Sequence, residues 1–255
     1  MINLEEKKKF ESICHTILSN ETPSLGIGTY CEKTLHRAIK HYICQDTDYH
    51  EVGIGPFVAD VLLDNVIYEI QSAGLFPLKK KLAYYLEHTN KSIQIVCPIL
   101  TAKRVIWVDK DTGTLSPPRK SPVGHGKMRV LPELLYLCDL LDFQRISILI
   151  VGLTADDYKL LDGKGADKKR GASRMERIPR ELTTLELLSS NADIARFFLP
   201  KELPDEFGAA EFSRLTNLRR RTLSAALKAL QKLGILEISG NRGKAVLYRR
   251  IRTLS

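Results

Sequence analysis

The sequence predicts a mixed α/β fold, in which a mixed β-sheet is flanked by helices and followed by a small basic domain. Three observations support this prediction. Helical and β-type segments alternate along residues 3–153. The 255 residues are 44% hydrophobic and 27% charged, a composition typical of a folded globular chain. The charge is uneven, because residues 1–160 hold 19 Lys+Arg and 19 Asp+Glu, whereas residues 206–255 hold 11 and 3.

The composition argues against several classes of protein. No run of about 18 apolar residues occurs, so we expect no membrane-spanning helix. The first residues lack the basic-then-apolar order of a secretory signal peptide. The five cysteines are scattered and form no Cys-x-x-Cys pair, which argues against a disulfide framework or a thiolate zinc site. We therefore expect a cytoplasmic protein with no membrane partner.

The apolar spacing predicts two helices and then a β-meander. Helical periodicity covers residues 3–19 and 30–44, and short period-two segments follow, separated by Gly55-Pro56 and Asp64-Asn65 turns. Further helices and strands complete the alternation of a mixed sheet with helices packed on it. The expected segments are strands over 51–55, 57–63, 66–71, 92–100, 103–109 and 145–153, helices over 77–88 and 130–141, and loops over 112–127 and 163–174.

Two carboxylates mark the predicted meander. Asp60 lies in an otherwise apolar strand, and Glu69 lies nine residues later on the next strand. If these strands pair antiparallel, the two carboxylates come close at one end of the sheet. A stable carboxylate pair usually holds a cation, and two carboxylates with backbone carbonyls and waters suit Mg²⁺. Two edge carboxylates in solvated turns would show the same spacing.

The segment Asp60-x8-Glu69-Ile70-Gln71, with a preceding helix that carries Glu32, resembles the PD-(D/E)XK nuclease superfamily, which has the restriction-endonuclease-like fold. The resemblance covers roughly residues 25–110. It implies that Asp60 and Glu69 bind the metal ion, Mg²⁺ or Mn²⁺. It also implies that Glu32 is an accessory acid, as in Holliday-junction-resolvase-like members. The sequence is similar as well to an uncharacterised bacterial family that joins a Glu-Ile-Gln core to a C-terminal winged helix.

The sequence departs from the family pattern at two positions. Ala59 rather than proline precedes Asp60, and Gln71 replaces the lysine that in the family orients or activates the attacking water. Three outcomes stay open: Gln71 serves in a two-metal site, a lysine reaches in from the next helix, or the fold only binds. Three lysines begin that helix, and we expect Lys79 to lie nearest the site.

The basic C-terminal segment resembles a winged helix-turn-helix. A helix over 208–215, a turn at 216–218 and a longer helix over 219–233 that ends at Gly234 precede two strands joined by a basic loop. In such domains the second helix approaches bases and phosphates with its N-terminus, and the wing meets the backbone or the minor groove. A winged helix used for protein contacts is the alternative. We expect DNA contacts from Arg219, Arg220, Arg221, Thr222, Arg242 and Lys244.

The sequence thus predicts three parts of the chain with different roles. These are a nuclease-like domain over residues 1–160, a basic loop and helical linker over 161–205, and a winged-helix DNA-binding domain over 206–255. The division separates a chemical site on a neutral domain from a polyanion-binding site on a basic one.

The leading functional hypothesis is a metal-dependent DNA endonuclease that hydrolyses phosphodiester bonds. Asp60 and Glu69 would hold Mg²⁺, Glu32 would assist, and Gln71 or Lys79 would position water. DNA would be the partner, and a homodimer would suit the cleavage of two strands. The alternative hypothesis is a catalytically inactive nuclease fold that binds DNA as a regulator.

Overall fold

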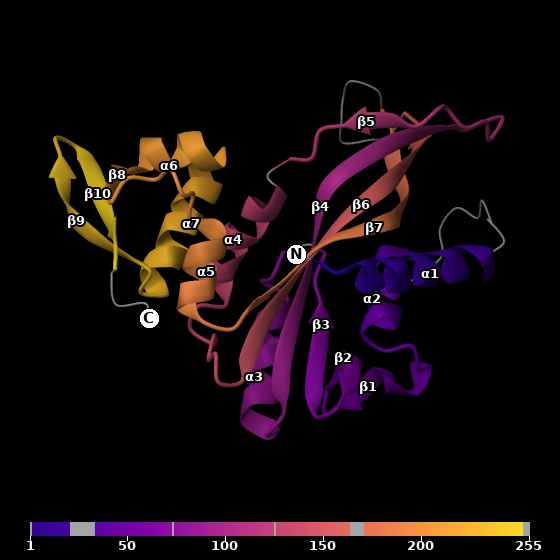
Figure 1. The fold of residues 1–255 in the computed structure, drawn as a ribbon, viewed down its shortest axis with the longest axis horizontal. Coiled ribbons are helices and arrows are strands. Elements are labelled where there is room, and N and C mark those ends of the chain that lie inside the picture. Colours follow the sequence, from indigo (N-terminus) through magenta and orange to yellow (C-terminus); the bar gives the residue numbers. More distant parts are fainter. Residues whose placement is uncertain (1, 21–33, 73, 125, 164–170, 252–255) are drawn as a thin grey trace.

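The computed structural model describes residues 2–20, 34–72, 74–124, 126–163 and 171–251. The chain forms a mixed α/β structure in which a seven-stranded mixed sheet is flanked by helices. A smaller unit with a three-stranded sheet follows at the C-terminal end (Figure 1). This architecture confirms the predicted fold class. Within the described residues, no helix is long and apolar enough to cross a membrane.

The large sheet combines an antiparallel meander with a parallel centre. Its strand order is β1-β2-β3-β4-β6-β7, and β5 pairs with β4. The first three strands form the predicted meander, β3, β4 and β6 run parallel, and β7 returns antiparallel to β6. The strands are β1 (His50–Ile54), β2 (Phe57–Leu63), β3 (Val66–Ile70), β4 (Ser92–Asp109), β5 (Arg119–Ser121), β6 (Ile146–Leu161) and β7 (Ser173–Leu188).

A tight turn and a crossover helix set the position of β3. Asp64 and Asn65 both have positive φ, 47° and 66°, which is the conformation of a two-residue hairpin turn that favours Asn and Asp. The turn pairs Leu63 with Val66 and so fixes the register of β2 on β3. Parallel strands need a longer connection, and α3 (Leu78–His88) supplies it between β3 and β4.

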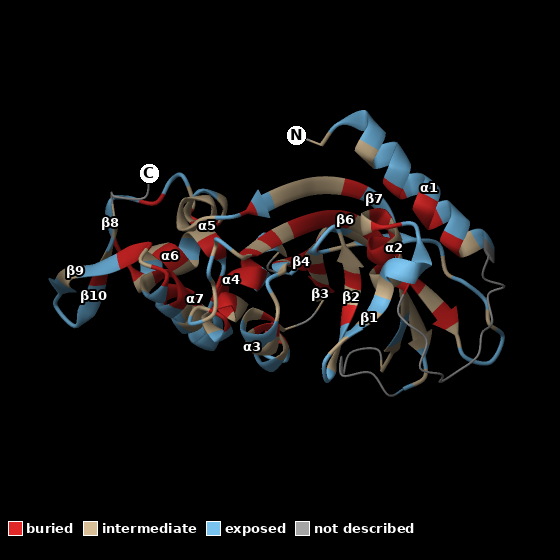
Figure 2. Ribbon diagram, turned by 90° about the horizontal axis from the view of Figure 1, so that it is seen from below, coloured by how far each residue is buried: buried red, intermediate tan, exposed pale blue. Residues whose placement is uncertain are grey.

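Helices cover both faces of the large sheet. Successive residues of a strand point to opposite faces, and those of β6 divide between two clusters of buried side chains. Ile148 and Ile150 belong to the cluster shared with α3 and the C-terminal unit, whereas Val151 belongs to the cluster of α1 (Leu4–Asn20) and α2 (Thr34–Ile43). Figure 2 shows the buried residues concentrated along the central strands and the sides of the helices that face them.

β4 is longer than the sequence predicts. The two strands expected over 92–100 and 103–109 are one 18-residue strand. Its pairing with β6 shifts between Leu100 and Ala102, where one extra residue interrupts the ladder. Such a bulge breaks the alternation of apolar and polar residues without ending the strand, which explains why the pattern indicates two elements.

The predicted end of the first domain is wrong for a related reason. The strand expected over 145–153 runs on to Leu161, and 16 of the 45 residues of the linker expected over 161–205 form the strand β7. Three shifts in the pairing of β7 with β6 disturb its period-two pattern. Residues 164–170, within the loop expected over 163–174, lie outside the described residues.

The helix expected over 130–141 is divided into short pieces. A 3-10 turn over Gly126–Arg129 leads into α4 (Val130–Glu133), and a second 3-10 turn covers Leu134–Tyr136. Pro132 has no backbone N–H, so it cannot donate the hydrogen bond that a continuous helix from Gly126 would require at this position.

The C-terminal unit has the predicted order of helix, turn, helix and hairpin. α6 (Ala209–Thr216) ends at Asn217, whose φ of 58° is left-handed, and α7 (Arg220–Lys232) follows. The hairpin consists of β9 (Leu236–Arg242) and β10 (Ala245–Arg250). A short strand that the sequence pattern does not predict, β8 (Glu206–Gly208), pairs with β10.

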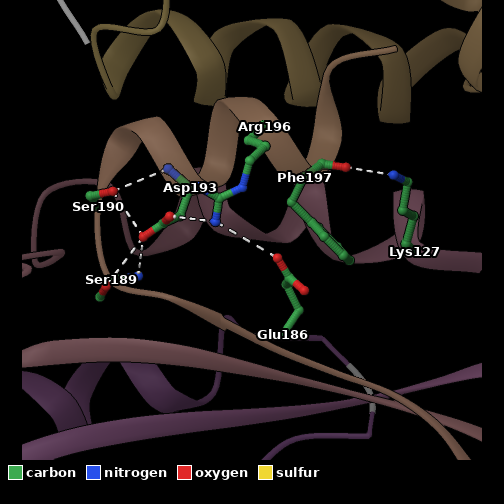
Figure 3. A network of polar contacts seen from close by, with 7 residues as sticks. All are labelled: Lys127, Glu186, Ser189, Ser190, Asp193, Arg196 and Phe197. Atoms are coloured by element: carbon green, nitrogen blue, oxygen red, sulfur yellow. Dashed lines mark hydrogen bonds and ion pairs between the residues drawn. The ribbon is translucent and has the colours of Figure 1, made fainter. Parts of the chain in front are cut away.

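A capped helix, α5 (Asn191–Phe198), connects β7 to the C-terminal unit (Figure 3). Ser190 accepts a hydrogen bond from the backbone N–H of Asp193 at 3.1 Å, and its hydroxyl donates to the Asp193 carboxylate at 2.9 Å. Arg196 bonds the same carboxylate at 2.7 Å and lies 3.7 Å from Glu186 of β7. Lys127 donates to the carbonyl oxygen of Phe197, which ties the turn before α4 to this helix.

The two units share one hydrophobic core. Leu131 and Leu134, from α4 and the turn after it, are fully buried in the same cluster as Ala229 and Leu230 of α7. At the edge of this contact, Nζ of Lys232 lies 3.0 Å from the Asp139 carboxylate. The buried apolar contact is the larger contribution, because an exposed ion pair adds little to stability. We therefore expect the two units to unfold together.

Truncation of a side chain in the shared core tests this coupling. Leu134→Ala should lower the free energy of unfolding by about 2–5 kcal/mol, because it removes buried methyl groups and leaves a cavity. Urea unfolding followed by far-UV circular dichroism should coincide with unfolding followed by fluorescence of Trp107, the one tryptophan of the chain. Two separated transitions in the wild-type protein would show that the units unfold independently.

Candidate active site

The register of the meander brings Asp60 and Glu69 together. β2 and β3 pair antiparallel with Val61 opposite Tyr68, so the next positions along the two strands are Asp60 and Glu69. The charge of Asp60 contributes to the raised pKa of Glu69, as expected of neighbouring carboxylates. The antiparallel pairing of these strands is therefore as predicted, and its register places the two residues at neighbouring positions.

Asp60 is held by two donors. Its Oδ2 accepts a hydrogen bond from the backbone N–H of Ile70 at 2.7 Å, and its Oδ1 lies 3.3 Å from Nε2 of His36 on α2. Burial alone would raise the pKa of Asp60, but the hydrogen bond and charge of His36, with the N–H of Ile70, hold it below its ordinary value. Asp60 is therefore an oriented carboxylate, and its side chain is 21% exposed.

Glu69 is almost completely buried and is held from α3. Its side chain is 1% exposed, with Nζ of Lys81 2.7 Å from Oε2 and the hydroxyl of Tyr85 3.2 Å from Oε1. Lys81 and Tyr85 are four residues apart and so share one face of the helix. Burial raises the pKa of Glu69 to about 7, although Lys81 opposes the shift. Burial and the charge of Glu69 raise the pKa of Tyr85 too, so its hydroxyl stays protonated.

The lysine predicted to lie nearest the site is the wrong one. Lys79 is exposed, and its Nζ lies 4.0 Å from Asp139, on the side of α3 near the C-terminal unit. Lys81 is the lysine that contacts Glu69. The helical spacing contained this information, because Lys81 lies three residues after Leu78 and four before Tyr85, both buried. A lysine two positions away projects from another side of the helix.

Gln71 does not join the carboxylates. Its backbone N–H donates to the carbonyl oxygen of Val96 at 2.8 Å, which extends the pairing of β3 with β4. Gln71 also lines a small pocket with Cys97, Arg129 and Glu133. No hydrogen bond connects its side chain to Asp60 or Glu69. The amide therefore makes no hydrogen bond to either carboxylate in this structure.

The remaining acid of the predicted set, Glu32, lies outside the described residues. Its proposed role can be compared with the structure only through α2, which begins at Thr34 and places His36 beside Asp60. Within the described residues, no group of three His, Cys, Asp or Glu side chains is close enough to hold a metal ion together.

Two carboxylates nevertheless fit a hard divalent cation. Mg²⁺ is commonly bound in proteins by one or two carboxylates, with water and substrate phosphate oxygens as the other ligands. Asp60 is ionised and partly exposed, and Glu69 is its neighbour across the strands. Because Lys81 now bonds Oε2 of Glu69, a cation at this position would share that oxygen with the ammonium group or displace it.

The predicted DNA contacts divide between two elements. Arg219, Arg220 and Arg221 are exposed at the start of α7, and Arg242 and Lys244 are exposed in the β9–β10 hairpin. Arg242 lies 3.5 Å from Glu211 of α6, an exposed contact that leaves its side chain 66% accessible.

Thr222 has a structural role at the start of α7. Its hydroxyl donates to the carbonyl oxygen of Arg219 at 2.7 Å and is 3.3 Å from the Arg219 backbone N–H. These contacts close the first turn of the helix, as a capping residue does. They engage the hydroxyl that the sequence analysis expected to contact DNA.

The fold and the site define a mixed α/β protein whose meander carries an oriented aspartate beside a buried, ion-paired glutamate. Residues 33–188 match the family described as "Domain of unknown function (DUF8091)", and the chain belongs to this family. The matched segment contains Asp60, Glu69 and Lys81 and ends with the last residue of β7. No curated protein and no solved structure matches the chain.

The burial of Glu69 predicts a dependence of stability on pH. The pKa of Glu69 is raised from 4.5 to about 7 in the folded protein, so between these values the folded state binds more protons than the unfolded state. The stabilisation by protonated Glu69 is present below pH 4.5 and is lost as the pH rises through 7. The wild-type protein should lose up to about 3 kcal/mol over this range relative to Glu69→Gln.

Urea titrations of both proteins between pH 5 and 8 in EDTA measure this difference. The glutamine variant is the matched control, because it has the shape of protonated glutamic acid and shares every other titrating group. A difference in stability that does not change with pH would mean that Glu69 is ionised throughout this range.

Proposed function

We propose that this protein is a metal-dependent nuclease that hydrolyses phosphodiester bonds of DNA and is directed to DNA by its basic C-terminal unit. The observation that carries the proposal is the group formed by Asp60, Glu69 and Lys81 at the β2–β3 strand pair. Two carboxylates on adjacent antiparallel strands with a lysine beside them resemble the PD-(D/E)XK nuclease site. In this chain the lysine would come from α3 instead of from the strand position of Gln71.

Asp60 and Glu69 are the residues that would hold the metal ion. A bound divalent ion supplies a more acidic water and positive charge beside the scissile phosphate. The contacts of Asp60 suit this role, because the N–H of Ile70 and the ring of His36 fix the carboxylate while its side chain remains partly exposed. A carboxylate of lowered pKa is ionised at neutral pH and available to a cation.

Lys81 would provide the positive charge that Gln71 cannot provide. Its side chain is 19% exposed and its ammonium group is directed to Glu69 by a 2.7 Å contact, so its position is defined before substrate binds. A cation fixed near the reacting phosphate stabilises charge in the transition state at no cost of reorganisation. Tyr85 would hold the other oxygen of Glu69 and keep that carboxylate in one orientation.

The C-terminal unit supports the choice of DNA as the substrate. Its helix, turn, helix and hairpin have the order of a winged helix, and the start of α7 carries three exposed arginines in succession. Positive charge at this end of a second helix is suited to phosphate contacts. The last 50 residues carry 11 Lys+Arg against 3 Asp+Glu, which favours a polyanionic partner.

One observation favours a second candidate, a DNA-binding protein with the nuclease fold and no activity. Both oxygens of Glu69 already accept hydrogen bonds, and the side chain is 1% exposed. A glutamate satisfied in this way can be a structural ion pair instead of a metal ligand. The two candidates differ in whether Asp60 and Lys81 are needed for any chemical step.

A cleavage assay with matched lysine variants separates the two candidates. The protein is incubated with Mg²⁺ or Mn²⁺ and linear, supercoiled, single-stranded or branched DNA. Asp60→Asn and Lys81→Ala should each lower the rate of cleavage by about 100-fold or more, because each removes a charge at the reacting phosphate. Lys79→Ala removes an exposed lysine of the same helix and should cleave at the wild-type rate.

Equal loss of activity in Lys79→Ala and Lys81→Ala would contradict the assignment of Lys81. Wild-type protein that binds DNA but cleaves none of the substrates would favour the inactive DNA-binding protein.

The salt dependence of DNA binding tests the role of α7. Arg220→Gln with Arg221→Gln should reduce the slope of log affinity against log salt by about 2, because each phosphate contact contributes about 0.9. Fluorescence anisotropy with a labelled duplex at several salt concentrations measures the slope. Arg249→Gln is a suitable control, because Arg249 bonds Glu237 within the hairpin. An unchanged slope would exclude the start of α7 from the interface.

A further inference from the structure

The far ends of the long central strands form a separate surface, which we call the arm. It consists of residues 101–109 of β4, residues 154–161 of β6 and residues 173–181 of β7, together with β5. Figure 1 shows these strand ends extending away from the C-terminal unit, with β5 alongside β4. The carboxylate site of Asp60 and Glu69 does not include this surface.

A buried aspartate organises two arginines on the arm. Asp156 is 1% exposed, and Nε and Nη2 of Arg104 lie 2.7 and 2.8 Å from its two oxygens. Nε of Arg180 lies 2.8 Å from the same carboxylate. The arginines come from strands on either side of β6, so the carboxylate joins β4 to β7. Charge-assisted contacts of this kind hold both guanidinium groups in fixed orientations.

The next residue of β6 repeats the arrangement on the opposite face. Asp157 is fully buried, with Nε and Nη2 of Arg177 2.5 and 2.9 Å from its oxygens and Nζ of Lys103 at 3.7 Å. Here the cations are themselves mostly buried, because the side chains of Arg177 and Lys103 are 15% and 20% exposed. This second group therefore has the features of an internal ion pair.

The Asp156 group is different because its cations face solvent. The side chains of Arg104 and Arg180 are 48% and 42% exposed. One arginine is enough to neutralise the buried carboxylate of Asp156. The exposed Glu181 of β7 also acts on Arg104, so the positive charge that remains on this face comes from the two arginines together with Lys120 of β5. The Nη1 of Arg104 and both Nη atoms of Arg180 have no hydrogen-bond partner among the described residues. They are donors held in place for an acceptor.

A third cation, Lys120, extends the positive charge of this face across the sheet. Lys120 of β5 pairs directly with Arg104 of β4, and Arg104 pairs with Asp156 of β6, so the three residues share one face. Lys120 is exposed. Arg180 lies on β7, three strands away from Lys120 in the order β5-β4-β6-β7. Neighbouring strands are about 4.8 Å apart, so the three cations span about 14 Å.

We infer that this row of Lys120, Arg104 and Arg180 binds the phosphate backbone of the nucleic acid, and we call it the arm cation row. The inference rests on the proposed function, because it assigns a second contact surface for the same substrate. A width of about 14 Å is too large for one small anion and corresponds to about four nucleotide steps of 3.4 Å. Asp156 acts as a positioning residue, which aligns the two guanidinium groups and holds them on rigid strands.

Single substitutions test the arm cation row without leaving Asp156 unpaired. In Arg104→Gln or Arg180→Gln, one arginine still neutralises the buried carboxylate, so the fold should be retained. Each variant should lower the slope of log affinity against log salt by about 0.9 and weaken binding about 5–10-fold at 0.1 M salt. The loss should be the same for duplexes of different sequence, as expected of phosphate contacts.

Two further variants make the test specific. The triple variant Arg104→Gln, Arg180→Gln, Asp156→Asn removes the buried charge with its partners and should lower the slope by about 1.8. Lys7→Gln with Lys8→Gln removes two exposed lysines of α1 and should leave the slope unchanged. Thermal unfolding of each variant confirms that it is folded.

The outcomes separate the inference from the proposed function. Wild-type slopes in both single variants, with a reduced slope in Arg220→Gln, Arg221→Gln, would overturn the arm cation row and leave DNA binding by the C-terminal unit intact. Absence of DNA binding by the wild-type protein would overturn both. An equal loss in the Lys7, Lys8 control would show that the effect comes from net charge and would also overturn the arm cation row.

Discussion

The carboxylate of Glu69 in the interior of the sheet constrains the structure around it. Removal of an ionised carboxylate from water costs several kcal/mol, so the surrounding elements must provide charge and hydrogen bonds. α3 does so with Lys81 and Tyr85, and the positions of these two residues fix how the helix is turned over the sheet. The same contact places Lys81 beside the strand pair that carries Asp60, so the packing of α3 also determines the composition of the candidate site.

The arm also contains buried carboxylates that are paired with cations from neighbouring elements. Asp156 and Asp157 are buried in successive positions of β6 and each is surrounded by two cations from neighbouring strands. These contacts join the long strands β4, β6 and β7 to one another. Because a buried ion pair adds little stability compared with apolar packing, its main structural effect is the orientation that it gives to the cations.

Much of the fold was predictable because its signals are local. The Asp64-Asn65 turn, the meander and the order of elements in the C-terminal unit follow from short-range spacing. The approach of Asp60 to Glu69 follows from the same register. β7 was not predictable, since shifts in its pairing disturb the alternation that identifies a strand. The prediction of Lys79 was wrong because it relied on position along the chain. Which lysine contacts Glu69 depends on the angular position around α3, and Lys81 shares a face with Tyr85.

The roles of Arg104 and Arg180 were not predictable from the sequence for a different reason. Both contact Asp156 from neighbouring strands, but they lie 52 and 24 residues away from it in the chain, and no local pattern connects them. The charge counts do not single out either arginine, because residues 1–160 hold 19 Lys+Arg and 19 Asp+Glu, and residues 161–205 hold 9 and 8. Only the register of β4, β6 and β7 shows that the buried Asp156 contacts both arginines. The same register shows that the two guanidinium groups lie together at the surface.

The central claim is that Asp60 and Glu69 form a site for a divalent cation, and calorimetric titration of the metal-free protein with Mg²⁺ and Mn²⁺ at pH 8 tests it most directly. The account predicts saturable binding to the wild-type protein and to Lys79→Ala, and loss of that binding in Asp60→Asn and Glu69→Gln. Identical binding curves for the wild-type protein and both carboxylate variants would contradict it, because the cation would then be bound elsewhere.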